Sequence, residues 1–142
     1  MLVPDVNLLL YATIDAFPQH PRAEAWWRET LSGTHTVGIP AVSALGFMRI
    51  ATNRRVLTTP MTVQAAAATV RGWLTQPHVH DLLPGARHIE LTLELLEHAG
   101  AAGNLTTDAQ IAALAVEHAG VIASNDTDFD RFPGVKRVNP LA

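Results

Sequence analysis

The feature that most constrains the fold is a single carboxylate that interrupts an apolar run at the start of the chain. The segment reads MLVPDVNLLLYA, so Asp5 stands between Val3 and Val6. An unpaired buried carboxylate is costly, so Asp5 must be paired, bind a metal or lie at a strand end. We predict a short buried strand that ends near Asp5 and a helix that begins near Asn7. Because ligand sites in open α/β sheets lie at the carboxyl ends of strands, Asp5 either carries reactive chemistry or simply caps the helix.

Composition narrows the class of protein further. The chain has 142 residues, 48% of them hydrophobic and 16% charged, so we expect one domain over residues 1–142 with a sizeable core. The chain has no cysteine, which excludes disulfides and thiolate metal sites. No apolar run approaches the roughly 20 residues of a membrane helix, and no basic segment precedes the first run. We therefore expect a cytoplasmic protein without membrane contact.

Charge also limits the partners. A net charge of −3 argues against a protein that coats nucleic acid generally. It leaves room for a local basic groove, because arginine supplies nearly all of the basic residues and binds phosphate in a bidentate manner.

Short apolar segments alternate with segments of helical periodicity. The predicted strands lie near Leu2–Pro4, Val37–Pro40, Val79–Leu82, Gly120–Ser124 and Lys136–Asn139, and the predicted helices include Leu8–Ile14, Ala41–Thr52, Thr62–Thr75 and Ile89–Gly100. A further helix is predicted from Thr107, where Thr107 and Gln110 have the spacing of a capping box, to Gly120. This alternation favours βαβ units and a parallel sheet covered on both faces.

Four aspartates fall where such a sheet would gather them. Asp5 follows the first strand, Asp108 lies in the first turn of a helix, and Asp126 and Asp128 follow the strand that ends at Ser124. Carboxylates packed together repel and raise a pKa, unless a hard cation such as Mg²⁺ or Mn²⁺ neutralises them. Such ions promote the in-line hydrolysis of phosphodiesters. The plainer alternatives are that Asp108 stabilises a helix N-terminus, that Asp126 caps a short helix and that Asp128 is solvated.

These segments resemble a known family. The N-terminal stretch, together with GFMRIATNRRV, NLTTDAQIAALAVEHAG and SNDTDFDRFPGVKRVNPL, resembles the PIN domain, in particular VapC ribonuclease toxins of the mycobacterial-type branch. The resemblance runs nearly end to end. It implies a three-layer α/β/α domain with a mostly parallel central sheet of four or five short strands. It also implies Mg²⁺- or Mn²⁺-dependent cleavage of structured RNA, often tRNA, inhibition by a VapB-type antitoxin, and a homodimer.

Site residues follow from the resemblance position by position. Asp5, Asp108 and Asp126 match the catalytic, metal-binding acids, and Asp128 matches a supporting metal ligand. Three further candidates for substrate binding are Asn7, Ser43 and Arg49.

One position departs from the family pattern. Many relatives carry a glutamate where this chain has Gly46, and no carboxylate occurs between Glu29 and Asp81. The site therefore either holds only one well-ordered metal, or is completed for a second by Ser43, water or substrate phosphate. Two alternatives stay open: a catalytically weak module that binds RNA or an antitoxin, and a phosphohydrolase with an aspartate nucleophile. The second would want a carboxylate at the position of Asn7.

Overall fold

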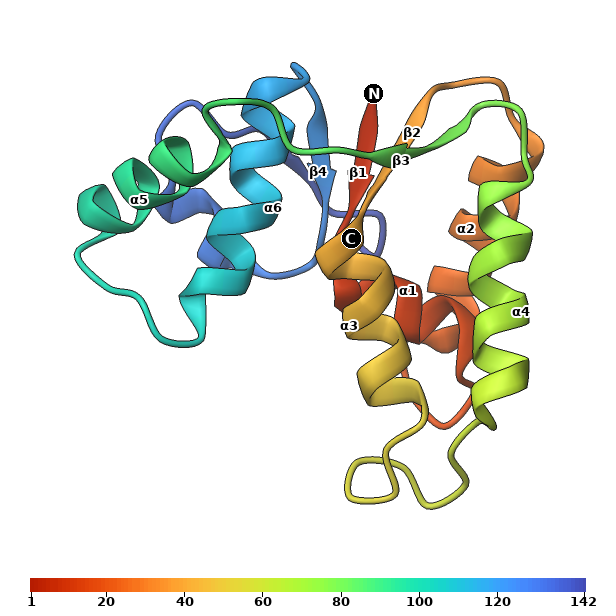
Figure 1. Cartoon of the computed structure of the whole chain (residues 1–142). Helices are drawn as coiled ribbons and strands as arrows, with labels where there is room; N and C mark the ends of the chain where they lie inside the picture. The colour runs from red at the N-terminus through yellow and green to blue at the C-terminus, as the bar shows by residue number, and fades with distance from the viewer.

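A five-stranded parallel sheet forms the middle layer of the molecule. The computed structural model describes residues 1–142, with helices on both sides of the sheet (Figure 1). The strands are β1 (Leu2–Pro4), β2 (Val37–Pro40), β3 (Val79–Leu82), β4 (Val121–Ala123) and β5 (Arg137–Val138). Their order is β3-β2-β1-β4-β5, and every neighbouring pair is parallel. The predicted three-layer α/β/α class and its short parallel strands are confirmed.

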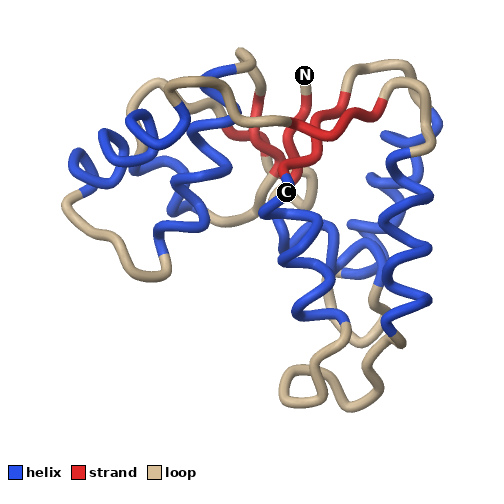
Figure 2. The backbone as a smooth tube through the Cα atoms, in the orientation of Figure 1, coloured by secondary structure: helices blue, strands red, loops and turns tan.

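Six α-helices and one 3₁₀ helix surround this sheet. They are α1 (Val6–Thr13), α2 (His20–Ser32), α3 (Ala41–Ala51), α4 (Val63–Leu74), α5 (His88–Ala99), α6 (Leu105–Glu117) and the 3₁₀ helix η1 (Thr127–Arg131). In Figure 2 the red strands run between two groups of blue helices, α5 and α6 on the left and α1 to α4 on the right and below. None of these helices combines the length and the apolar character needed to cross a bilayer.

The central strand β1 determines where Asp5 lies. Leu2 is in register with both Val37 and Val121, and Pro4 is in register with Ala123. The next residue, Asp5, donates its backbone N–H to the Ala123 carbonyl at 3.1 Å. Asp5 and the residue after β4 therefore lie side by side at the carboxyl edge of the sheet. Both strands are buried there, since Val3 and Ile122 are fully shielded from solvent.

The prediction of a capping box at Thr107–Gln110 is wrong. Helix α6 begins at Leu105, and its N-terminal flanking residue, Asn104, makes no side-chain capping bond. The backbone itself closes this turn, because Leu105 N–H donates to the Ala102 carbonyl and Thr106 N–H to the Gly103 carbonyl, both at 3.1 Å. Asp108 still lies within the first turn of the helix.

Candidate metal centre

Asp5 is buried and held at both carboxylate oxygens. It caps α1 at its N-terminus, where Oδ1 accepts the Asn7 backbone N–H at 2.7 Å. Its Oδ2 accepts a hydrogen bond from the Ser124 hydroxyl. Only 4% of the residue is exposed, and burial raises the pKa of Asp5 although both hydrogen bonds act to lower it. Asp5 is thus a helix cap, which is one of the two roles that its position in the sequence left open, and it also lies at a strand end.

The turn after β4 presents two more carboxylates. The buried Ser124 hydroxyl accepts the Asp126 backbone N–H at 3.0 Å, and Asp126 Oδ1 in turn accepts the Asp128 backbone N–H at 2.8 Å. Asp126 is therefore the N-cap of η1, as the capping interpretation predicts. This chain of hydrogen bonds ties Asp5, Ser124 and Asp126 into one rigid unit across β1 and β4.

Asp108 approaches the same place from α6. One carboxylate oxygen each from Asp108, Asp126 and Asp128 lies within 4.8 Å of the other two. None of the four aspartates forms a salt bridge, and the guanidinium of Arg137 pairs with Asp130 while its charge interacts with that of Asp126. Burial first, and then the charges of Asp126, Asp5 and Asp128, raise the pKa of Asp108 to about 7.

These residues fit a hard divalent cation. All of the donors are carboxylate oxygens, which suit Mg²⁺ or Mn²⁺ better than Zn²⁺. Burial raises the pKa of Asp108 most, and repulsion from the neighbouring carboxylates adds to it; a bound cation would offset both effects. The structure brings Asp108, Asp126 and Asp128 together and places Asp5 beside them in the hydrogen-bonded unit of Ser124.

The three candidates for substrate binding occupy different environments. Asn7 is half-buried in the first turn of α1, next to the cluster. Arg49 is exposed in the last turn of α3. Ser43 is completely buried, and its hydroxyl donates to the Pro4 carbonyl at 3.0 Å. That bond anchors α3 to the end of β1, immediately before Asp5.

Gly46 packs against the start of α1. A Cβ atom at this position would lie 3.0 Å from Cγ2 of Val6, the residue that follows Asp5. The position expected to carry a glutamate in relatives is therefore close to the carboxylate cluster, but a side chain there would press on Val6.

Sequence reasoning missed the supporting residues of this site. In the sequence Ser124 is only the end of a predicted strand, whereas in the structure its hydroxyl joins Asp5 to the Asp126 backbone. Burial, and then the charges of Asp5 and Asp126, raise the pKa of Tyr11, a residue that no sequence pattern assigned to the site. A signal for Ser124 was available, since it ends the predicted strand two residues before Asp126.

Concavity alone would not have found this site. A hollow of about 790 Å³ lies at the opposite edge of the sheet and is lined by the beginnings of β1, β2 and β4, including Leu2, Val37 and Val121. None of the four clustered aspartates lines it. The clustered carboxylates, rather than the depth of a cavity, distinguish the carboxyl edge of the sheet as the candidate site.

A parallel α/β sheet with carboxylates gathered at its carboxyl edge is typical of proteins that bind a divalent cation there. The family model of the PIN domain matches residues 2–135, and the chain therefore belongs to the PIN domain family. Curated relatives match this chain over nearly its full length. The chain is 49% identical to Ribonuclease VapC33 of Mycobacterium tuberculosis over 141 residues, with 99% of both chains covered. It is 38% identical to Ribonuclease VapC37 of the same species, with 100% of this chain and 99% of the relative covered.

Solved structures share the fold at low sequence identity. A structure of FitAB bound to an IR36 DNA fragment matches with a TM-score of 0.69 and 17% identity, covering 100% of this chain and 96% of the other. VapBC-1 from nontypeable Haemophilus influenzae matches with a TM-score of 0.68 and 14% identity, covering 99% of this chain and 98% of the other.

Proposed function

We propose that the chain is a metal-dependent endoribonuclease toxin that hydrolyses phosphodiester bonds in structured RNA, with tRNA as the expected substrate. The names of its relatives support ribonuclease activity, since VapC33 and VapC37 are both called ribonucleases. The observation that carries the proposal is the gathering of Asp5, Asp108, Asp126 and Asp128 from three separate segments without a salt bridge to any of them.

The proposed roles follow from how each carboxylate is held. Asp108, Asp126 and Asp128 would bind Mg²⁺ or Mn²⁺, together with Asp5. When bound, such a cation supplies a Lewis acid for the phosphate and lowers the pKa of a water molecule. Asp5 cannot rotate freely, because the Ser124 hydroxyl and the Asn7 backbone N–H fix its two oxygens. Asp126 is likewise fixed by the backbone of η1, so the donors are preorganised.

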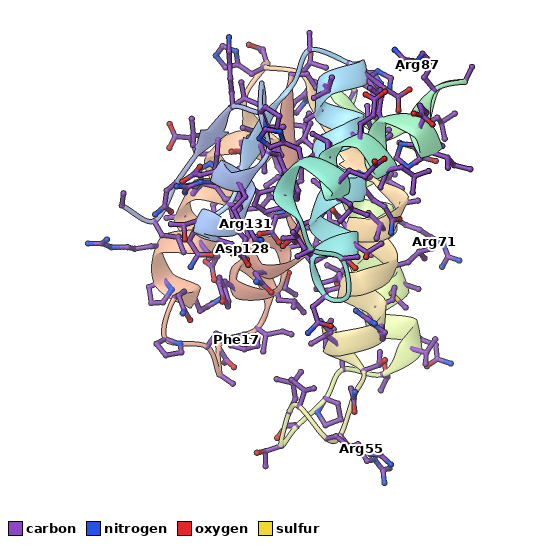
Figure 3. All side chains as sticks on the ribbon, turned by 90° about the vertical axis from the view of Figure 1, so that its left-hand side faces the viewer. Phe17, Arg55, Arg71, Arg87, Asp128 and Arg131 are labelled. Carbon is purple, nitrogen blue, oxygen red and sulfur yellow. The ribbon has the colours of Figure 1, made fainter.

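Exposed arginines are the candidates for holding the RNA backbone. Arg131 lies near Asp128 in the view of Figure 3, whereas Arg55 lies at the tip of the loop between α3 and α4. Arg131 is exposed, and its guanidinium donates to the Ala99 carbonyl at 3.3 Å, which leaves other donors free for phosphate. Phosphate contacts of this kind weaken with salt, so RNA affinity should fall as the salt concentration rises.

A VapB-type antitoxin is the expected protein partner, and the protein is expected to form a homodimer. The solved structures that share the fold include VapBC-1, the VapBC2 structure from Rickettsia felis bound to DNA, and FitAB, and these motivate the proposal. Co-purification with the product of a short adjacent reading frame tests the antitoxin. Analytical ultracentrifugation of the isolated chain tests the dimer, and a monomer at micromolar concentration would contradict it.

The activity itself is tested with total RNA and purified tRNA. The wild-type chain is incubated with Mn²⁺ or Mg²⁺, beside Asp5→Asn, Asp108→Asn and Asp126→Asn. Asp81→Asn is a matched control, because Asp81 is exposed on the edge strand β3, which β2 and β1 separate from β4. We expect discrete fragments from the wild type and the control. We expect none from the three site variants, each checked for folding by circular dichroism.

The possible outcomes separate the proposal from its alternatives. Fragments that persist in all three folded site variants would contradict it. RNA retention without cleavage by the wild type would favour the weak binding module, and turnover of a small phosphomonoester through a trapped aspartyl phosphate would favour the phosphohydrolase.

A further inference from the structure

One stretch of the chain carries positive charge and no negative charge. Residues 30–80 contain four arginines and no aspartate or glutamate, so their formal charge is +4 with histidine neutral. The rest of the chain has six basic and thirteen acidic residues, which gives it a formal charge of −7. The stretch includes β2, α3, α4 and the loop between these two helices. Charge is therefore segregated within a protein whose net charge is only −3.

The arginines of this stretch also differ from the others in their contacts. The other five each donate a side-chain hydrogen bond within the molecule, and they are Arg22, Arg28, Arg87, Arg131 and Arg137. Within the stretch, four exposed side chains form neither a hydrogen bond nor a salt bridge, namely Arg49, Arg54, Arg55 and Arg71. An unpaired guanidinium keeps all of its donors for a ligand, and its planar fork matches the geometry of a phosphate.

The loop between α3 and α4 holds Arg54 and Arg55 in a defined position. The Asn53 side chain accepts the Arg55 backbone N–H at 2.9 Å, and the Asn53 carbonyl accepts the Leu57 N–H at 3.0 Å. Leu57 is only 6% exposed and fixes the loop to the hydrophobic core. The backbone that carries the two guanidinium groups is thus ordered before a ligand arrives, which lowers the entropic cost of binding.

The loop projects from the same edge of the sheet as the carboxylate cluster. Helix α3 begins directly after β2, where the Ser43 hydroxyl bonds to the Pro4 carbonyl just before Asp5. The helix then runs away from the sheet to the loop (Figure 1), and its 11 residues span about 16 Å. Figure 3 shows Arg55 at the end of this loop, well below Asp128. One phosphate cannot contact both places, whereas an RNA of several nucleotides can.

We propose that Arg49, Arg54 and Arg55 form a second binding surface, which holds the backbone of a structured RNA at a distance from the phosphate that is cleaved. This inference rests on the proposed RNA substrate, and it means that the protein selects RNA by size and shape. Arginine–phosphate contacts position a nucleic acid without reading its bases. RNA is favoured over an acidic protein segment because the loop and the proposed cleavage site lie at one edge of the sheet.

The test compares Arg54→Gln/Arg55→Gln with a control that has the same change in net charge, Arg87→Gln/Lys136→Gln. Both control residues are exposed and lie outside the carboxylate-free stretch, and Arg87 is at the opposite end of the molecule from Arg55 in Figure 3. Fluorescence anisotropy measures the binding of purified tRNA in Ca²⁺ at several salt concentrations.

The binding measurement has a defined expected result. We expect Arg54→Gln/Arg55→Gln to weaken tRNA binding by about tenfold at roughly 0.1 M salt, and to lower the slope of log affinity against log salt by about two. Arg54→Lys/Arg55→Lys should keep the slope of the wild type, because it keeps the charge. The control should keep both the affinity and the slope of the wild type.

Cleavage kinetics provide a second readout. In Arg54→Gln/Arg55→Gln we expect KM for tRNA to rise while kcat stays unchanged, because the surface contacts the RNA away from the reacting phosphate. We expect kcat/KM to be unchanged for an oligonucleotide that spans the mapped cleavage site and is too short to reach the loop. Both variants should keep the thermal midpoint of the wild type, and a loss shared by the long and the short substrate would contradict the inference.

The remaining outcomes separate RNA from other occupants of this surface. Equal tRNA affinity of the wild type and Arg54→Gln/Arg55→Gln, or an equal loss in the control, would overturn the inference and leave the ribonuclease proposal intact. Unchanged tRNA affinity with weaker antitoxin binding would overturn it in favour of an acidic protein segment. Unchanged tRNA affinity with loss of self-association at low salt would overturn it in favour of a second copy of the chain. A wild type that neither binds nor cleaves RNA would overturn both proposals.

Discussion

Asp108 shows most clearly how the fold changes the chemistry of a single residue. In the sequence it is an ordinary acid in the first turn of a helix, whereas in the structure burial, and then three other carboxylates, raise its pKa. The simpler interpretation, that Asp108 stabilises the N-terminus of a helix, is compatible with its position in the first turn of α6. Proximity to Asp126 and Asp128, which no local pattern encodes, gives it the further property of a candidate metal ligand.

The raised pKa of Asp108 predicts a specific pH dependence of stability without metal. The pKa rises from 3.8 to about 7 on folding, so between these values the folded state binds more protons than the unfolded state. The free energy of unfolding should therefore fall as the pH rises through this range. Asp108→Asn should remove this contribution and be more stable than the wild type above pH about 7. Urea unfolding in the presence of a chelator measures it, and parallel pH profiles for the two proteins would count against the account.

Ser124 is the residue on which the geometry of Asp5 and Asp126 depends. Ser124→Ala removes the donor to Asp5 and the acceptor of the Asp126 N–H, and both groups are at least half-buried. We expect the free energy of unfolding to fall by about 1–3 kcal/mol and the pKa of Asp5 to rise further. Ser32→Ala, at the exposed end of α2, is the control and should change stability by less than about 0.5 kcal/mol. Equal effects of the two substitutions would refute this role.

Gly46 tests whether the cluster lacks a carboxylate. Because its missing Cβ faces Val6, next to Asp5, we expect Gly46→Glu to tighten Mn²⁺ binding and to lower the thermal midpoint by pressing on Val6. Gly46→Gln is a matched control, since it has the same shape without the charge. Calorimetry that shows equal Mn²⁺ affinity in the two folded variants would argue against a missing ligand.

At the scale of elements, apolar patterning predicted the strands and most of the helices well. Val37–Pro40 is a strand with the predicted bounds, and α3 differs from its predicted range only at the last residue. A buried strand flanked by prolines, or a helix with an apolar stripe, can be recognised from the residues of that segment alone. The start of α6 has no such local signal. Its first turn is closed by backbone hydrogen bonds to the Ala102 and Gly103 carbonyls, without a capping side chain.

The connection from α6 to β4 depends on a close backbone approach at Gly120. A Cβ atom there would lie 2.8 Å from Cγ2 of Val3, a fully buried residue of β1. We expect Gly120→Ala to lower the free energy of unfolding by about 1–3 kcal/mol through overpacking. Gly72→Ala in α4, where nothing lies within 4 Å of the added Cβ, should raise it by roughly 0.5–1 kcal/mol. Urea titrations that give both variants the same sign would contradict this account of the strand connection.

On the scale of the whole molecule, topology assembles the site. The parallel order β3-β2-β1-β4-β5 makes β1 and β4 neighbours, although Asp5 and Ser124 are 119 residues apart in the sequence. The sequence predicted that the carboxylates converge, because parallel strands end at one edge. It could not predict the supporting contacts of Ser124 and Ser43, since these depend on the side-chain geometry between elements far apart in the sequence.

The carboxylates gathered at one edge of the sheet are the feature on which the proposed activity depends. The most direct test is a crystal grown or soaked with Mn²⁺ and measured for anomalous scattering. The account predicts a strong anomalous peak bound by the carboxylates of Asp108 and Asp126, with Asp5 or Asp128 as a further ligand. A fully soaked crystal with no peak at these residues, or with Mn²⁺ bound only elsewhere, would contradict it.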